Sequence, residues 1–74
     1  MRVKFVIFKK ELVALFPSEK ENDNCILSYQ HVGQHGAASY SLMRCKKATK
    51  EEYVSLLQEL KNIGYDDLII MNEK

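Results

Sequence analysis

Both histidines of the chain lie in one short segment, together with two of its three glycines and two of its four tyrosines. The segment runs from Tyr29 to Tyr40. Histidine and tyrosine side chains transfer protons and bind polar ligands, and glycines let the backbone approach a ligand closely. A plain hairpin turn needs none of these residue types, so the loop from His31 to Tyr40 within this segment is predicted to be a recognition surface. The alternative reading is an irregular connection whose rings cover a sheet edge.

Zinc binding is one chemistry that the segment and its flanks suggest. The nominal ligands are Cys25, His31, His35 and Cys45. A His-x3-His pair converges on one metal when it lies on a helix, and Gly33 and Gly36 argue against a helix here. Cys25 lies on an expected strand, roughly 20 Å from His31 along an extended chain. We therefore expect no metal, no resident cofactor and two free thiols.

Nucleophilic catalysis is a second chemistry. A cysteine or serine near either histidine could supply a nucleophile and base pair, but none of them sits in a recognisable nucleophile motif. A domain of this size also has little depth for a pocket that excludes water. No catalytic residue is assigned, and the enzymatic alternative is a homo-oligomer in which His31 or His35 acts as general base at a subunit interface.

Nucleic-acid binding is a third possibility, because four cations fall within the seven residues from Arg44 to Lys50. The formal net charge is only +1, but residues 1–50 carry nine basic and four acidic side chains, whereas residues 51–74 carry two and six. A short basic run is also what a solvated turn between two elements contains. The sequence therefore leaves a weak nucleic-acid binder open as an alternative, and it contains no glycine-rich phosphate loop.

The elements that must position these residues include several short strands. Residues 3–8 are rich in β-branched and aromatic residues, and residues 12–16 form a second apolar run after the polar residues 9–11. This spacing predicts a β-hairpin, with bulky side chains on both faces of the first strand. Pro17 is expected to end the second strand, and residues 18–24 to form an exposed loop. Residues 25–32 and 40–45 read as two further strands joined by an irregular loop at 33–39.

A helix follows, and its start is marked by a capping box of Thr49 and Glu52. Gly64 is placed to end it in a left-handed conformation. Residues 68–71 then predict a final strand, covered on both faces or at a subunit interface. The chain is thus expected to be one α+β domain of residues 1–74, in the order β-β-β-β-α-β, with the helix on one face of a small antiparallel-type sheet. The residues expected to be buried on the helix are Tyr53, Leu56, Leu57, Leu60 and Ile63.

The chain resembles a family of small bacterial and bacteriophage proteins that has no assigned activity. The resemblance rests on Ser-Tyr-Gln-His-Val-Gly-Gln-His-Gly-Ala at residues 28–37, on Thr-x-Glu-Glu-Tyr at residues 49–53, and on Ala-Leu-Phe-Pro at residues 14–17. Leu60 and the Ile-Gly-Tyr ending at residues 63–65 also match. Lys50 stands where relatives carry proline, a difference confined to the first helical position. The resemblance implies a bacterial or bacteriophage origin and no particular chemistry.

We therefore predict a small binding or adaptor module in preference to an enzyme. Its partner is an unidentified protein or a nucleic acid, and a homodimer is an open alternative. The basic start followed by residues 5–8 is too short for a signal peptide, and no apolar run approaches a membrane span. A cytoplasmic location without membrane contact is the corresponding expectation. The candidate binding residues are His31, Gln34, His35, Tyr40 and Arg44.

Overall fold

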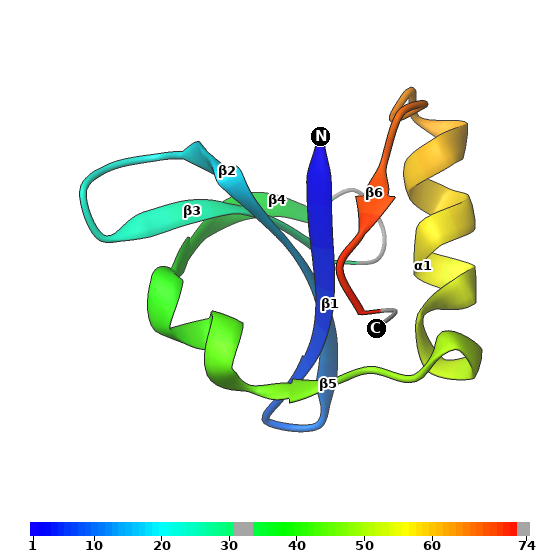
Figure 1. Ribbon diagram of the computed structural model, residues 1–74, viewed down its shortest axis with the longest axis horizontal. Helices are drawn as coiled ribbons and strands as arrows, with labels where there is room; N and C mark the ends of the chain where they lie inside the picture. The colour runs from blue at the N-terminus through cyan, green and yellow to red at the C-terminus, as the bar shows by residue number, and fades with distance from the viewer. Residues whose placement is uncertain (31–33, 73–74) are drawn as a thin grey trace.

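A largely antiparallel sheet with one helix beside it forms the framework of the protein (Figure 1). The structure is a computed structural model that describes residues 1–30 and 34–72. The elements, in chain order, are β1 (Arg2–Phe8), β2 (Glu11–Lys20), β3 (Cys25–Gln30), β4 (Gln34–Ser39), the 3-10 helix η1 (Tyr40–Arg44), β5 (Lys46–Lys47), α1 (Lys50–Asn62) and β6 (Ile69–Ile70).

The predicted first hairpin is confirmed, and its turn consists of only two residues, Lys9 and Lys10. β1 and β2 pair antiparallel, and Glu11 already belongs to the second strand. Both lysines have positive φ, 51° and 68°. Positive φ at both central residues is the signature of a type I′ turn, whose twist matches that of the flanking strands.

The second strand continues past Pro17, so the expectation that this proline ends it is wrong. β2 extends to Lys20, and its pairing with β3 shifts register between Phe16 and Lys20. Proline has no N–H to donate to a ladder, and an irregularity of this kind lets a strand accommodate it. The remaining polar residues from Glu21 to Asn24 form the exposed connection to β3.

The largest correction concerns residues 33–45. The predicted loop contains strand β4, which pairs with β3 through six consecutive residue pairs, and the predicted strand at 40–45 is instead helix η1. Strand β3 begins at Cys25 as expected and is described to Gln30. Small residues in β4 extend readily beside β3, and Ser39 then caps η1 by accepting a hydrogen bond from the Ser41 amide at 3.3 Å. Pairing with β3 therefore overrides the local turn signals of this segment.

The sheet order is β4-β3-β2-β1-β5, and β6 pairs with β1 in parallel. The capped helix is confirmed. The Thr49 amide donates to Glu52 Oε1 at 2.8 Å, and the Glu52 amide donates to Thr49 Oγ1 at 3.3 Å. Gly64, just after the helix, has a φ of 118°. The α+β class is thus confirmed, with η1 and β5 added to the expected order.

Both faces of β1 contribute to the hydrophobic core, as the alternation of its residues predicts. Val3 and Phe5 pack on the side of α1, and the Phe5 ring stacks on Tyr53 at a centroid distance of 4.5 Å. Val6 belongs to a second cluster, against which Leu42 and Met43 of η1 pack.

Three expectations about burial need correction. Leu57 is only half-buried, and Ile63 is 49% exposed at the end of the helix. Ile69 of β6 is 61% exposed, so the final strand is not covered on both faces within one chain. Within α1, the side chains that anchor the helix in the core are Tyr53, Leu56 and Leu60.

Candidate functional site

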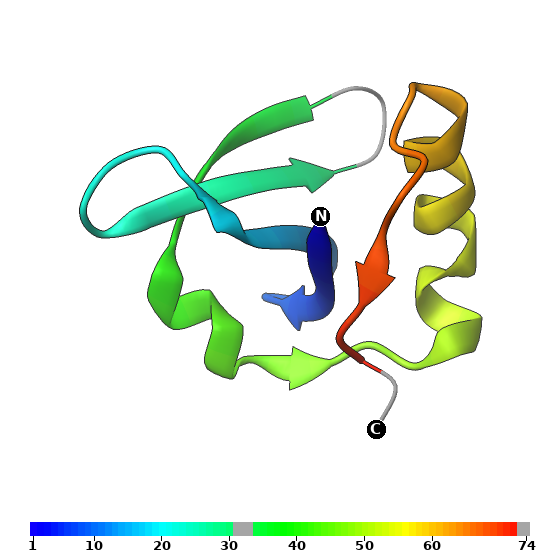
Figure 2. The same cartoon turned by 45° about the horizontal axis from the view of Figure 1, so that its top comes forward.

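Strand β4 lies at one margin of the sheet, with β3 as its neighbour in the described part of the chain (Figure 2). His35, Gly36, Ala37 and Ser39 are all exposed. The strand contains no Lys, Arg, Asp, Glu or Pro, and its pairing with β3 shows no register shift. Charged residues, prolines and bulges are the usual devices that keep an edge strand from pairing further. These particular protections are missing from β4.

The direction of the β4 backbone groups follows from one hydrogen bond at the end of the strand. The Tyr40 amide donates to the Asn24 carbonyl at 2.9 Å, which continues the β3–β4 register. In an antiparallel pair, residues bonded to the partner strand alternate with residues whose N–H and C=O groups point away from it. The outward set is therefore His35, Ala37 and Ser39. These residues offer a row of backbone donors and acceptors at the sheet margin.

The His35 side chain is held by a group of rings at the α1 end of β4. His35 Nε2 lies 3.1 Å from the Tyr65 hydroxyl, and the His35 ring makes an edge contact with the Tyr29 ring at 4.6 Å. The Tyr29 hydroxyl donates to the Glu59 carboxylate. Phe16 stacks on Tyr65 at a centroid distance of 5.2 Å. These contacts connect β4 with the helix and with the segment that follows it.

Glu59 and Tyr65 are site residues that sequence reasoning missed. Glu59 is half-buried and accepts a hydrogen bond from the Tyr29 hydroxyl. Tyr65 belongs to the family resemblance, which was the one available signal for it. Neither position is close to His35 in the sequence, so only the folded chain brings them together.

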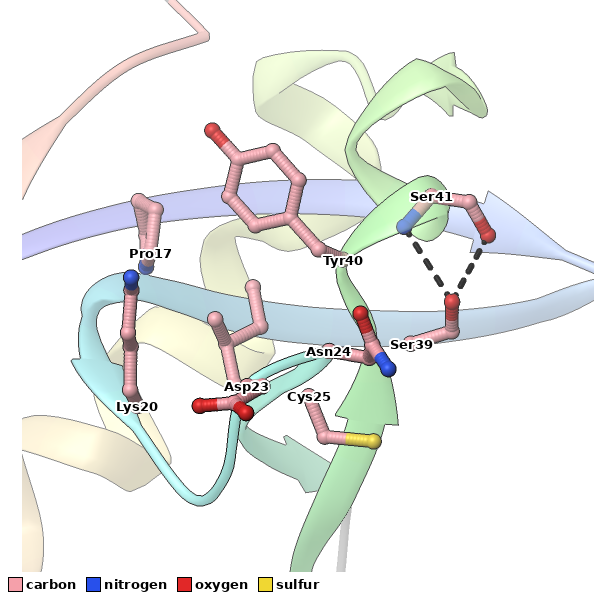
Figure 3. Close-up of a pocket in the computed structure, with 9 residues that line it drawn as sticks. Pro17, Lys20, Asp23, Asn24, Cys25, Ser39, Tyr40 and Ser41 are labelled. Carbon is pink, nitrogen blue, oxygen red and sulfur yellow. Dashed lines mark hydrogen bonds between the residues drawn. The ribbon is translucent and has the colours of Figure 1, made fainter.

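A surface hollow lies at the opposite end of β4, where the β2–β3 connection meets the start of η1 (Figure 3). Its volume is about 560 Å³, and Tyr40, which is 54% exposed, contributes to its lining. Ser39 Oγ lies 2.8 Å from Ser41 Oγ on another part of the rim. Cys25 lines the hollow, but His35 does not, so thiol and imidazole are not brought together there.

The structure separates the candidate binding residues that it describes. His35 and Tyr40 lie five positions apart, roughly 16 Å along an extended strand, and Arg44 is exposed in the last turn of η1. His31 and the Gln34 side chain lie outside the described residues, although the Gln34 backbone begins β4. The candidates therefore mark a strand and its two ends, and they do not form one compact pocket.

The described residues contain no group of three His, Cys, Asp or Glu side chains arranged to hold a metal ion. Cys25 and Cys45 are both free thiols. None of the described helices is long and apolar enough to cross a membrane. In comparisons with known proteins, no family model, no curated protein and no solved structure matches the chain.

Proposed function

We propose that this protein is a small binding module that takes up an extended segment of a protein partner along the outer edge of β4, the edge that faces away from β3. The observation that carries the proposal is the row of outward backbone groups on His35, Ala37 and Ser39, in a strand without charge, proline or bulge. An extended peptide that adds to such an edge gains main-chain hydrogen bonds, and flanking surfaces select its side chains. This sharpens the sequence-based hypothesis, because the recognition surface becomes a strand edge instead of a loop.

The side chains beside the edge indicate what kind of segment would fit. Gly36 has open space where a Cβ would stand, and Ala37 is small and exposed. A partner strand can therefore place large side chains over the middle of β4. The exposed His35 and Tyr40 would contact its two ends. A six-residue strand spans about 20 Å, which matches a partner segment of about six residues.

The test is a substitution that removes one outward donor and leaves the β3–β4 ladder intact. Ala37→Pro deletes the central outward N–H, and proline is tolerated on an edge strand when its nitrogen faces solvent. Ala37→Ser is the matched control, because it also changes the side chain but keeps the amide. Random peptides displayed on phage are selected against the wild-type protein, and the best binders are measured by fluorescence polarisation.

We expect Ala37→Pro to weaken the selected peptides at least about ten-fold, which corresponds to about 1.4 kcal/mol, while Ala37→Ser stays within about two-fold. Amide hydrogen exchange at His35, Ala37 and Ser39 should slow when a peptide binds to the wild-type protein. Peptides that bind Ala37→Pro as well as wild type, or that leave these amides exchanging freely, would exclude the edge as the binding site.

The enzymatic alternative has less support from the described residues. A general base needs a substrate proton or a nucleophile within hydrogen-bond reach. The recorded partner of His35 Nε2 is the Tyr65 hydroxyl, in an exposed position outside the hollow. The arrangement instead suits a ring that holds one end of β4 in place for recognition.

A further inference from the structure

Six cations from two separate stretches of the chain gather at the end of the molecule opposite β4 in the strand order. Ile7 of β1 pairs with Lys46 of β5, so β5 lies beside the Lys9-Lys10 turn (Figure 1). The end of η1 is joined to β1 as well, because Lys4 Nζ donates to the Met43 carbonyl at 2.6 Å. We call this surface the basic end, and it consists of Lys9, Lys10, Arg44, Lys46, Lys47 and Lys50.

The charge of the basic end is only partly offset by carboxylates in the described part of the chain. All six side chains are exposed, and no ion pair joins any of them to a carboxylate in the described part of the chain. Three acidic residues, Glu11, Glu51 and Glu52, are next to the basic end in the sequence. Glu11 accepts from Gln30 Nε2 at 3.0 Å, Glu52 belongs to the capping box, and Glu51 is exposed in the first turn of α1. With these three carboxylates nearby, the six cations still leave the surface with an excess of positive charge, although the whole chain is nearly neutral.

The backbone of the turn gives an independent reason to assign a role to this charge. Lys9 and Lys10 both adopt left-handed conformations, which side chains with a Cβ disfavour. Asn-Gly is the preferred pair in such turns. Two lysines in these positions are thus a poor choice for stability, and strained positions of this kind concentrate at functional sites.

An exposed aromatic ring accompanies the cations. Phe8 is 37% exposed, and Lys9 Nζ lies 5.4 Å from the centre of its ring. Lys46 and Lys47 point to opposite faces of β5, so positive charge wraps around that edge of the sheet. Cations that follow a phosphate backbone, combined with an exposed ring on which a base stacks, are the means by which proteins bind single-stranded nucleic acid.

We infer that the basic end binds single-stranded nucleic acid, with the lysines and Arg44 on phosphates and Phe8 stacked on a base. The inference is independent of the proposed peptide edge, because β4 and β5 lie at opposite ends of the strand order. Binding that releases counterions weakens as salt is added. The logarithm of the binding constant falls linearly with the logarithm of the salt concentration, and each phosphate contact on a single strand contributes about −0.7 to this slope. Six contacts would therefore give a slope of about −4.

The test uses Lys9→Asn/Lys10→Gly, which removes two charges and installs the preferred turn residues. Its thermal midpoint should equal or exceed that of the wild type, so a loss of binding cannot be attributed to unfolding. Binding of a fluorescein-labelled oligothymidylate of about 16 nucleotides is followed by anisotropy between about 50 and 200 mM salt. We expect affinity near 0.1 M salt to fall about 25-fold and the slope to decrease by about 1.4 in magnitude, from two lost contacts.

The matched control is Lys20→Asn/Lys61→Asn, which removes the same charge from other parts of the molecule. It should retain affinity within about two-fold, because both lysines lie outside the basic end. Phe8→Ala should weaken binding several-fold without changing the salt slope, since stacking releases no counterions. If the turn variant fails to fold, Lys46→Gln/Lys47→Gln gives the same comparison.

Three results would overturn the inference. The first is no saturable binding of the oligonucleotide by the wild type at about 50 mM salt. The second is an equal loss in the control variant, which would mean that net charge alone governs binding. The third is equal or tighter binding of a duplex of the same length, which would assign the surface to polyanions in general. None of these measurements involves the β4 edge.

Discussion

The side chain of Asn72 closes a gap in the hydrogen bonding along one edge of β1. This edge is paired with β6 at Arg2 and Val3 and with β5 at Val6 and Ile7, which leaves Phe5 between them. Asn72 Oδ1 accepts from the Phe5 amide at 2.8 Å, and Asn72 Nδ2 donates to the carbonyls of Phe5 and Ala48 at 2.7 and 2.9 Å. One amide side chain therefore acts as a missing strand residue and joins the C-terminal segment to the approach to α1.

Replacing Asn72 with alanine removes these three hydrogen bonds and leaves the Phe5 amide, in a fully buried residue, without that partner. A typical hydrogen bond contributes about 0.5–1.5 kcal/mol, and an unsatisfied buried donor costs about 1–3 kcal/mol. We expect Asn72→Ala to lower the free energy of unfolding by about 2–4 kcal/mol. This is a large part of the roughly 5–15 kcal/mol that stabilises a folded domain.

The assay is urea denaturation followed by circular dichroism, with the midpoint and m-value fitted for each variant. Asn62→Ala is the control, because Asn62 is exposed on α1 and its side chain accepts a hydrogen bond from the Gln58 side chain at 3.3 Å, not from a buried backbone group. The control should change stability by less than about 0.5 kcal/mol. Asn72→Asp keeps an acceptor but loses both donors, so it should also be destabilised. If Asn72→Ala behaved like Asn62→Ala, the assigned role of this side chain would be refuted.

Two further predictions concern the helix and the candidate site. Leu56→Ala should lower the free energy of unfolding by about 2–5 kcal/mol, because Leu56 is completely buried. The control Val54→Ala should change the free energy of unfolding by less than about 0.5 kcal/mol, because Val54 is 49% exposed. Equal denaturation midpoints for the two would show that α1 docks through another face. His35→Ala should lower the free energy of unfolding by no more than about 1 kcal/mol, because the hydrogen bond between His35 and Tyr65 is exposed. The same substitution should weaken the binding of the peptides selected on β4. A His35→Ala variant that unfolds would instead show that the side chain has a structural role.

Local patterns in the sequence were sufficient to predict the elements that depend on nearby residues. The capping box and the apolar spacing predict α1, because both are interactions within a few turns of helix. The hairpin of β1 and β2 is predicted by two apolar runs on either side of a short polar interruption. Bulky residues at both odd and even positions also predict that β1 is covered on two faces, as the two core clusters show.

The candidate site depended on contacts between distant residues, and here sequence reasoning was only partly successful. It selected the segment around His35 from its composition, but glycine and alanine there read as a loop. Whether such residues form a strand depends on an available partner edge, which β3 supplies. Likewise, the contacts of His35 with Tyr65 and of Tyr29 with Glu59 each span thirty positions along the chain.

The sequence by itself therefore determined the helix, the first hairpin and the α+β class, since these follow from residue spacing and local hydrogen bonding. Only the tertiary structure decided that residues 34–39 form an edge strand, that Asn72 completes the pairing of β1, and that the Lys9-Lys10 turn lies beside β5. Each of these arrangements satisfies backbone groups of one segment with groups from another. The local spacing of apolar residues does not specify which distant segment will be adjacent in the folded protein.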